Sequence, residues 1–185
     1  MPNLGRIIDG HNSKVIASKI PVVPKRPWGN CSCPRATRDA GECVLDGECI
    51  SESLVYRATV KVKVAPEAEQ VPDKTYLGVV EPEFKERLGN HKQDWKNPNK
   101  RGATCLSKYI WSLQDKGLEK DKDWSVSWSL MARAKAFSPS SGYCRLCIME
   151  KALMILHPEW AQLNDRDEFF AHCRHKNKLL LSSVK

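Results

Sequence analysis

Apolar and polar positions alternate over two stretches in the first half of the chain. β-branched and apolar residues recur at partly alternating positions in SLVYRATVKVKV (residues 53–64) and again in KTYLGVV (residues 74–80). Alternation of this kind is typical of strands that place one face on a core. The intervening residues 65–73 contain two prolines, so we expect a long hairpin loop that sets the two strands side by side.

A helical period replaces the alternation in residues 81–95. Apolar or aromatic positions recur there at i, i+4, i+7 and i+11, which places one stripe on the helix, made of Phe84, Leu88, His91 and Trp95. Arg87 lies four residues before His91, so the two side chains share one face of the predicted helix.

The second half predicts four further elements. Residues 103–117 fit an amphipathic helix that ends at Gly117, and residues 124–134 alternate Trp, Val and Leu against Ser, as a strand with one solvated face does. An apolar helix is expected over residues 144–158, and a turn with a further helix over residues 160–181. The order ββααβαα predicts an α+β fold, with a small three-stranded antiparallel-type sheet flanked by helices.

Composition narrows the expected partners. The 41% of hydrophobic residues suffices for a core in a 185-residue chain, and the net charge of +8 fits a polyanion such as nucleic acid. The alternative is a basic protein with a solvated, lysine-rich surface. The start of the chain lacks the pattern of a secretory signal, and no apolar run reaches 18 residues. We therefore expect an intracellular protein without a membrane partner.

Eight cysteines then need an explanation. In a reducing compartment, clustered cysteines are more often metal ligands than disulfides, although an even number would suit a disulfide framework in a secreted chain. Residues 31–50 hold four cysteines among too few apolar residues to fold alone, so a metal or cross-links are expected there. Cys144 and Cys147 also have ligand spacing, and Cys173 could join them, but their apolar helix favours buried thiols.

Three regions follow from these patterns. Residues 1–30 are expected to be a linker or tail, residues 31–50 a cysteine-rich, zinc-finger-like segment, and residues 51–185 the main domain.

Six side chains that could bind ions or transfer protons occur in a characteristic order along the predicted strands and helices. They are Tyr56, Tyr76, Arg87, His91, Glu150 and Asn164. This series resembles the GIY-YIG nuclease family, with LVY (54–56) in place of the first signature and YLG (76–78) in place of the second.

The resemblance is closer to one branch of that family. The runs CVLDGECISESLVYRATV, TYLGVVEPEFKERLGNHKQDW, CRLCIMEK and CRHKNKLLL look like the C-terminal endonuclease of Penelope-like retroelements. The similarity covers essentially the whole chain, and residues 1–30 look like the connector that follows a reverse transcriptase. The chain is therefore expected to be a truncated copy or an excised domain. It departs from the family in having Leu-Val for Gly-Ile, YLG for YIG and a longer hairpin loop.

The resemblance implies a metal-dependent DNA endonuclease. Such an enzyme would act in the nucleus, nick DNA and support target-primed integration of a retrotransposon, with DNA as its substrate and element RNA or a reverse transcriptase domain as further expected partners. The alternative is a catalytically inactive, zinc-stabilised nucleic-acid-binding module.

Roles for individual residues are implied in the same way. Glu150 would hold Mg²⁺ or Mn²⁺, Arg87 would bind the scissile phosphate, and Tyr56 would activate water with help from Tyr76 and His91. Each has a simpler alternative: a surface pairing of Glu150 with lysine, an Arg87–Glu83 ion pair, and a core-edge position for His91.

Asn164 is either catalytic or the cap of a helix that begins at Asp165. The basic runs KNPNKR and CRHKNK, with Trp95 and Trp111 nearby, would contact DNA, or else form solvated loops.

Penelope-like endonucleases also carry a Cys-Cys-His-His zinc-finger-like motif with cysteines upstream of the first signature strand. The resemblance therefore implies a structural zinc bound by Cys33, Cys43, Cys49 and His175. An all-cysteine site that uses Cys31 is the nearest alternative, and His172 is another candidate ligand.

Overall fold

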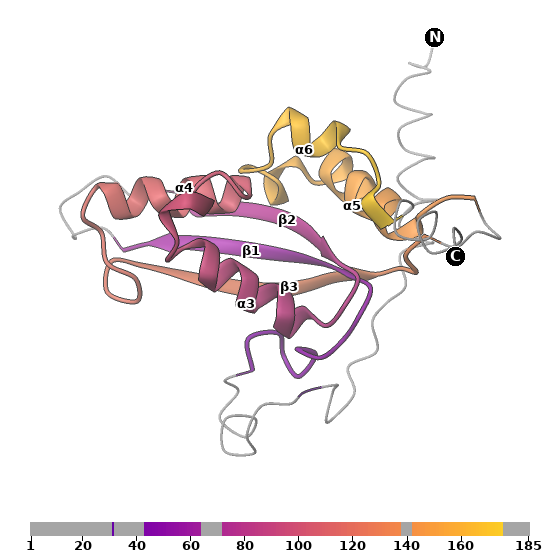
Figure 1. Cartoon of the computed structure of the whole chain (residues 1–185), viewed down its shortest axis with the longest axis horizontal. Coiled ribbons are helices and arrows are strands. Elements are labelled where there is room, and N and C mark those ends of the chain that lie inside the picture. Colours follow the sequence, from indigo (N-terminus) through magenta and orange to yellow (C-terminus); the bar gives the residue numbers. More distant parts are fainter. Residues whose placement is uncertain (1–30, 32–42, 64–71, 138–141, 176–185) are drawn as a thin grey trace, which may run out of the picture.

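Three β-strands and four α-helices make up the described part of the chain, which comprises residues 31, 43–63, 72–137 and 142–175 of the computed structural model (Figure 1). In chain order the elements are β1 (Leu54–Val62), β2 (Lys74–Val80), α3 (Phe84–Asp94), the 3₁₀ helix η1 (Pro98–Lys100), α4 (Cys105–Asp115), β3 (Trp124–Arg133), α5 (Arg145–Leu156), the 3₁₀ helix η2 (Pro158–Trp160) and α6 (Arg166–Phe170). The predicted ββααβαα order and the α+β class are confirmed. Residues 1–30, expected to be a tail, lie outside the described residues.

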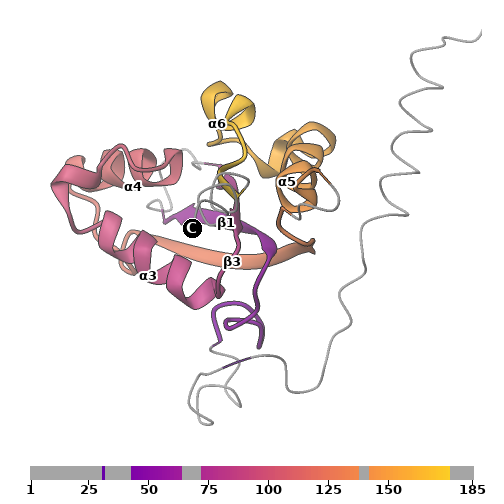
Figure 2. The same cartoon turned by 45° about the vertical axis from the view of Figure 1, so that its right-hand side comes forward.

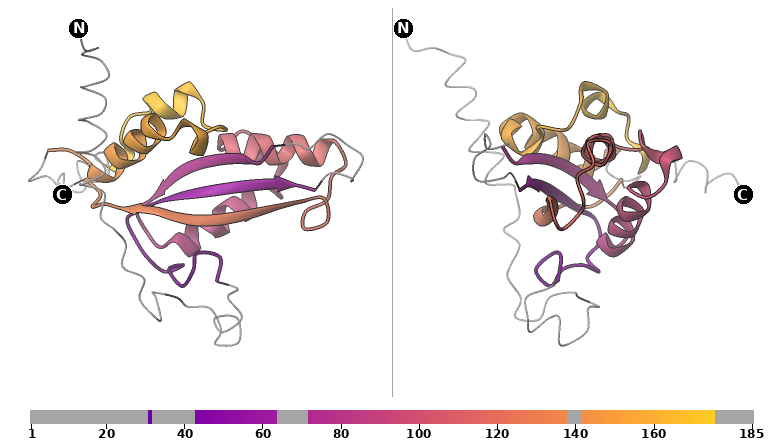
Figure 3. Two further views of the ribbon diagram at one scale, coloured as in Figure 1. Left: turned by 180° about the vertical axis from the view of Figure 1, so that it is seen from behind. Right: turned by 90° about the vertical axis from the view of Figure 1, so that its left-hand side faces the viewer.

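The sheet is antiparallel, with β1 between β2 and β3, as the view from behind shows (Figure 3). In the β1–β2 pair, Tyr56 lies opposite Gly78 and Ala58 lies opposite Tyr76. Side chains that alternate along a strand share a face every second residue, so Tyr56 and Tyr76 are diagonal neighbours on one face. The hairpin register therefore brings Tyr56 and Tyr76 together.

Helices cover both faces of this sheet. On one side α3 and α4 pack over Tyr56, Ala58 and Val60, and on the other side α5 packs over Val55 and Leu77 (Figure 2). The predicted stripe of α3 faces the core on the Tyr56 side of the sheet, where Phe84, Leu88, His91 and Trp95 are all buried. None of the helices in the described ranges is long and apolar enough to cross a bilayer.

A β-bulge lets strand β3 contribute to both cores. Val55 pairs with Ala132 but the next residue, Tyr56, pairs with Leu130, so Met131 is an extra residue on β3. An extra residue reverses the alternation of side chains. Trp128 therefore packs with α3, whereas Ala132 packs with α5. The expected alternation holds over residues 124–129, where Trp124 and Trp128 are buried and Ser127 on the opposite face is exposed, and the bulge changes it only near Ala132.

Local signals fix the ends of the helices. Thr104 caps α4 by accepting a hydrogen bond from the backbone N–H of Ser107, and the chain leaves α4 through Gly117, whose φ of 78° is accessible to glycine at little cost. Asp165 caps α6 by accepting from the N–H of Glu168. The cap expected of Asn164 is thus made by its neighbour.

Candidate functional site

A buried hydrogen-bond network joins strand β1 to helix α3. The hydroxyl oxygen of Tyr56 accepts a hydrogen bond from Nε of Arg87 at 3.0 Å and lies 2.8 Å from Nε2 of His91. Tyr56 and His91 have no exposed surface, and the imidazole packs among Trp95, Trp128 and the Tyr56 ring. Arg87 does not pair with Glu83 in the described structure. The spacing of Arg87 and His91 thus serves to hold one phenol.

Burial sets the protonation of this network. It lowers the pKa of His91 to about 3, helped by the nearby Arg87, so the imidazole is neutral at pH 7. Burial also raises the pKa of Tyr56, against an opposing effect of Arg87, and raises that of Tyr76 further. Both tyrosines are therefore neutral phenols at pH 7. The Nδ1 atom of His91 has no hydrogen-bond partner among the described residues.

Gly78 leaves the space in which the rings of Tyr56 and Tyr76 lie. A Cβ atom on residue 78 would lie 2.6 Å from the Tyr56 hydroxyl oxygen and 3.0 Å from Cε1 of Tyr76. Glycine is required at this position of the YLG run for a steric reason, because any side chain would collide with the ring of Tyr56 on the neighbouring strand.

A cavity of about 400 Å³ opens beside the edge strand β2, between α3 and α5. We call it the α3–α5 cavity. Its walls include the predicted site residues Tyr76, Arg87, Glu150 and Asn164 and, in addition, Lys151, Glu168, His172 and Arg174. Tyr56 and His91 do not reach it, because they lie behind Arg87 in the core. Four of the six predicted catalytic side chains therefore share one solvent-accessible space.

Glu150 is the most perturbed carboxyl group of this cavity. Burial raises its pKa to about 7, partly offset by Lys151 and reinforced by Glu168. The Lys151 ammonium lies 3.7 Å from the Glu150 carboxylate, and the Glu150 side chain is 13% exposed. The lysine pairing is thus present, but Glu150 is not a surface residue. One neighbouring ammonium does not compensate the burial of this carboxylate.

Asn164 holds the outer edge of β2. Its amide nitrogen donates to the carbonyl of Leu77, and its amide oxygen accepts from the N–H of Leu77, both at 2.8 Å. The side chain thereby replaces a neighbouring strand at that residue. Asn164 also donates to Glu168 at 2.9 Å.

Glu168 is a site residue that the sequence analysis missed. Besides Asn164, it accepts hydrogen bonds from the Tyr76 hydroxyl at 3.4 Å and from the N–H of Cys105 at 3.3 Å. The thiol of Cys105 donates to Asp165 at 2.9 Å, and burial with this bond raises its pKa to about 12. Glu168 belongs to the polar run NDRDE, in which no periodicity singles out one carboxylate.

Two groups of cysteines could hold a metal ion such as zinc. In the N-terminal cysteine cluster (Cys31, Cys43 and Cys49), Sγ of Cys31 lies 3.4 Å from Sγ of Cys43 and 3.5 Å from that of Cys49. Cys31, expected only as an alternative ligand, thus joins the predicted Cys43 and Cys49. Cys33 lies outside the described residues.

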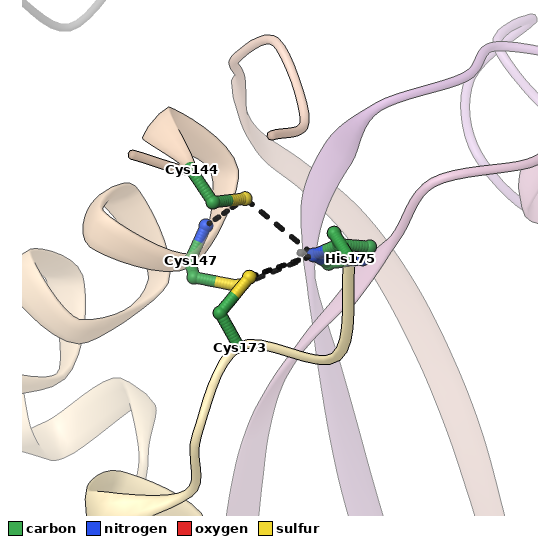
Figure 4. A group of neighbouring side chains, drawn as sticks. All are labelled: Cys144, Cys147, Cys173 and His175. Carbon is green, nitrogen blue, oxygen red and sulfur yellow. Dashed lines mark hydrogen bonds between the residues drawn. The ribbon is translucent and has the colours of Figure 1, made fainter. Parts of the chain in front are cut away.

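His175 does not join that cluster, which corrects the expected ligand set. It lies with Cys144, Cys147 and Cys173, because the segment after α6 runs back to the start of α5 (Figure 4). We call this group the Cys₃His cluster. The expectation of plain buried thiols at these three positions overlooked the histidine. The other candidate, His172, lines the α3–α5 cavity and belongs to neither cluster.

Trp95 and Trp111 were expected to lie near DNA beside the basic loop that precedes α4, and the structure excludes this for Trp95. Trp95 is a core residue, 5% exposed and stacked on Trp128, so it cannot stack on bases. Trp111 is half-buried beneath the guanidinium of Arg101, which pairs with Asp115 at 2.7 Å. Residues 176–178 of the second basic run lie outside the described residues.

Comparisons with protein-family models, with curated proteins and with solved structures give no match to this chain. The site has to be interpreted from its own geometry.

Proposed function

We propose that the protein is a metal-dependent DNA endonuclease of the GIY-YIG type, acting for a Penelope-like retroelement by nicking DNA in the nucleus. One observation carries the proposal: a guanidinium from α3 and a carboxylate from α5 that is 13% exposed face the same cavity. Cleavage of a phosphodiester needs positive charge for the phosphoryl oxygens and an activated water, and these two groups can help to supply both.

The donor set suits a hard divalent cation. Glu150 is an oxygen ligand whose pKa is raised chiefly by burial despite the nearby Lys151 and Arg87, and Glu168 lines the same cavity. Mg²⁺ keeps most of its water and takes one or two protein carboxylates, so a site of this size fits Mg²⁺ or Mn²⁺. When bound, the ion would neutralise phosphate charge and lower the pKa of a coordinated water.

Arg87 is the residue that would bind the phosphate. Its Nε is engaged by Tyr56, which fixes the direction of the side chain and leaves the terminal nitrogens for an anion. Tyr56 and His91, with no exposed surface, are positioning residues for this guanidinium.

Tyr76 is the phenol that can meet a substrate in the cavity. Its hydroxyl lies 3.4 Å from the Glu168 carboxylate, so it can take a proton from the attacking water while passing its own to Glu168. Water oxygen then bonds to phosphorus as the bond to the leaving oxygen breaks, and that oxygen stays on the cut DNA strand and takes a proton from solvent in the cavity. Asn164 keeps Tyr76 and Glu168 in register through Leu77 and its own bond to Glu168.

Nicking of supercoiled plasmid tests the proposal. Wild-type protein should convert supercoiled to open-circular DNA with Mg²⁺ or Mn²⁺ and not with chelator, and Glu150→Ala or Arg87→Ala should slow this by about 100-fold or more. Exposed residues offer matched controls: Glu159→Ala for the carboxylate and Lys92→Ala for the cation should retain the wild-type rate. Nicking that persists unchanged in Glu150→Ala contradicts the assignment.

A second function is favoured by the two metal-capable clusters, which are typical of small nucleic-acid-binding modules. In that case zinc-loaded wild-type protein would retard DNA in a gel without nicking it in any metal. The plasmid assay separates the two functions directly.

A further inference from the structure

We propose that Cys144, Cys147, Cys173 and His175 bind one structural zinc ion, which fastens the segment after α6 to the start of α5. This proposal stands on the geometry of the Cys₃His cluster alone and does not depend on the nuclease assignment.

The four side chains converge on one point. Nδ1 of His175 lies 3.5 Å from Sγ of Cys144, 3.3 Å from Sγ of Cys147 and 3.7 Å from Sγ of Cys173 (Figure 4). All four potential ligand atoms lie within 4.8 Å of one another. Tetrahedral zinc with Zn–S and Zn–N bonds of about 2.3 and 2.0 Å separates sulfur from nitrogen ligands by about 3.5 Å. The observed separations match that arrangement.

Hydrogen bonding alone does not account for this arrangement. Nδ1 of a neutral imidazole offers either one hydrogen or one lone pair, so it can pair well with one thiol. Here three sulfur atoms surround the same nitrogen at similar distances. A cation at their centre satisfies all four ligands at once.

Local sequence supports the same conclusion. Cys144 is the N-cap of α5, and its sulfur accepts from the backbone N–H of Cys147 at 3.5 Å. An N–H directed at sulfur and the positive end of a helix suit a ligand atom that carries negative charge when it holds a metal ion. The other two ligands come from a Cys-x-His pair, so two short motifs from distant parts of the chain complete the set.

The ligand set is closed, which makes the ion structural. Four protein ligands leave no open position for water or substrate. The consequence reaches the α3–α5 cavity, because Cys147 and His175 belong to its wall and Arg174 lies between two ligands. Zinc would hold Arg174 on the cavity wall, and Glu150 follows Cys147 by one turn of α5.

Metal analysis of the full chain provides the test. In a Cys43→Ser background, which disables the N-terminal cysteine cluster, protein purified without chelator should contain about one zinc per chain. Adding Cys144→Ser or His175→Ala should remove that zinc. The matched control is His172→Ala, which changes a nearby histidine outside the cluster and should leave the zinc content unchanged.

A ligand exchange guards against variants that fail to fold. His175→Cys in the same background should retain one metal, and its Co²⁺-substituted form should show stronger sulfur-to-metal charge-transfer absorption than the parent, because four thiolates replace three. Equal zinc in the parent and in His175→Ala, or identical Co²⁺ spectra for the parent and His175→Cys, overturns the proposal.

Discussion

Arg87 separates two regions that use similar side chains in opposite ways. Behind it, Tyr56 and His91 lie in a dry aromatic core with no exposed surface. In front of it, Tyr76, Glu150 and Glu168 line a cavity that solvent can enter. The same residue types are therefore structural on one side and available for chemistry on the other. Tyr56 and Tyr76 are diagonal neighbours on one face of the sheet. The two tyrosines therefore differ not in the face they occupy but in how far each lies from solvent.

The difference also appears in how each region satisfies its polar atoms. In the dry region Tyr56 pairs with both Arg87 and His91. In the cavity Glu150 has one ammonium at 3.7 Å and a pKa raised to about 7. A buried hydroxyl with two partners stabilises the fold, whereas an undercompensated carboxylate favours a bound cation. Four predictions test this contrast.

The largest effect is expected from Gly78→Ala, which disturbs both regions at once. The new Cβ would lie 2.6 Å from the Tyr56 hydroxyl oxygen, and that ring is enclosed by Phe84 and Trp128. We expect the free energy of unfolding, measured in urea, to fall by about 3 kcal/mol.

Gly89→Ala is its matched control. Residue 89 lies in α3 with nothing within 4 Å of its added Cβ, so this change should stabilise the protein by about 0.5–1 kcal/mol. Equal urea midpoints for the two variants would show that the steric reason given for Gly78 is wrong.

Removing one hydroxyl from each region gives the next contrast. Tyr56→Phe leaves Nε of Arg87 and Nε2 of His91 without their shared partner, which should lower the free energy of unfolding by about 2 kcal/mol. Tyr76→Phe removes a single long contact with Glu168 and should cost less than about 1 kcal/mol. A larger loss for Tyr76→Phe would reverse the assignment of the dry and solvated regions.

Glu150→Gln should stabilise the protein in the absence of divalent metal. Because the folded pKa of about 7 exceeds the usual 4.5, the folded state binds more protons than the unfolded state between these values, and stability falls as pH rises through 7. At pH 8 the glutamine variant should therefore be more stable by about 2 kcal/mol.

The matched change for that variant is Glu159→Gln, at an exposed carboxylate. It should alter stability at pH 8 by less than about 0.5 kcal/mol. Thermal unfolding in chelator measures both, and a destabilised Glu150→Gln would contradict the raised pKa.

The smallest expected effect concerns acid and His91. Since its folded pKa of about 3 lies below the usual 6.5, the unfolded state takes up a proton first as pH falls. Lowering the pH from 7 to 5.5 should cost about 1 kcal/mol of unfolding free energy through this residue.

Glu150 titrates with the opposite sign over the same range, so His91 is best measured in a Glu150→Gln background. There His91→Gln should remove the acid loss, whereas His157→Gln, at a half-exposed imidazole, should not. The same pH slope with and without His91 would exclude a buried neutral imidazole.

Periodicity predicted the elements well but not the partnerships between distant segments. The strand at residues 74–80 and the buried stripe of α3 follow from local patterns that the fold preserves. The grouping of His175 with Cys144, Cys147 and Cys173 does not, because it depends on how the segment after α6 returns to α5. Spacing identifies which residues can be ligands, and tertiary structure decides which of them meet.

Local patterns also could not predict how far each side chain lies from solvent. Alternation places Tyr56 and Tyr76 on a face, but the distance of each from solvent depends on α3 and on the segment beyond α5. Glu168 was missed for a related reason: its contacts with Tyr76 and Cys105 join residues 164–168 to β2 and α4, which are distant in the sequence.

The bonds that Asn164 makes to Leu77 also bear on how the protein behaves when crowded. β2 is an edge strand, and unpaired backbone groups on such an edge invite a strand from another molecule. Asn164 occupies both groups of Leu77, and the N–H of Leu163 occupies the carbonyl of Thr75. A chain cut after α5 would expose this edge, and we expect such a fragment to aggregate by pairing its β2 strands.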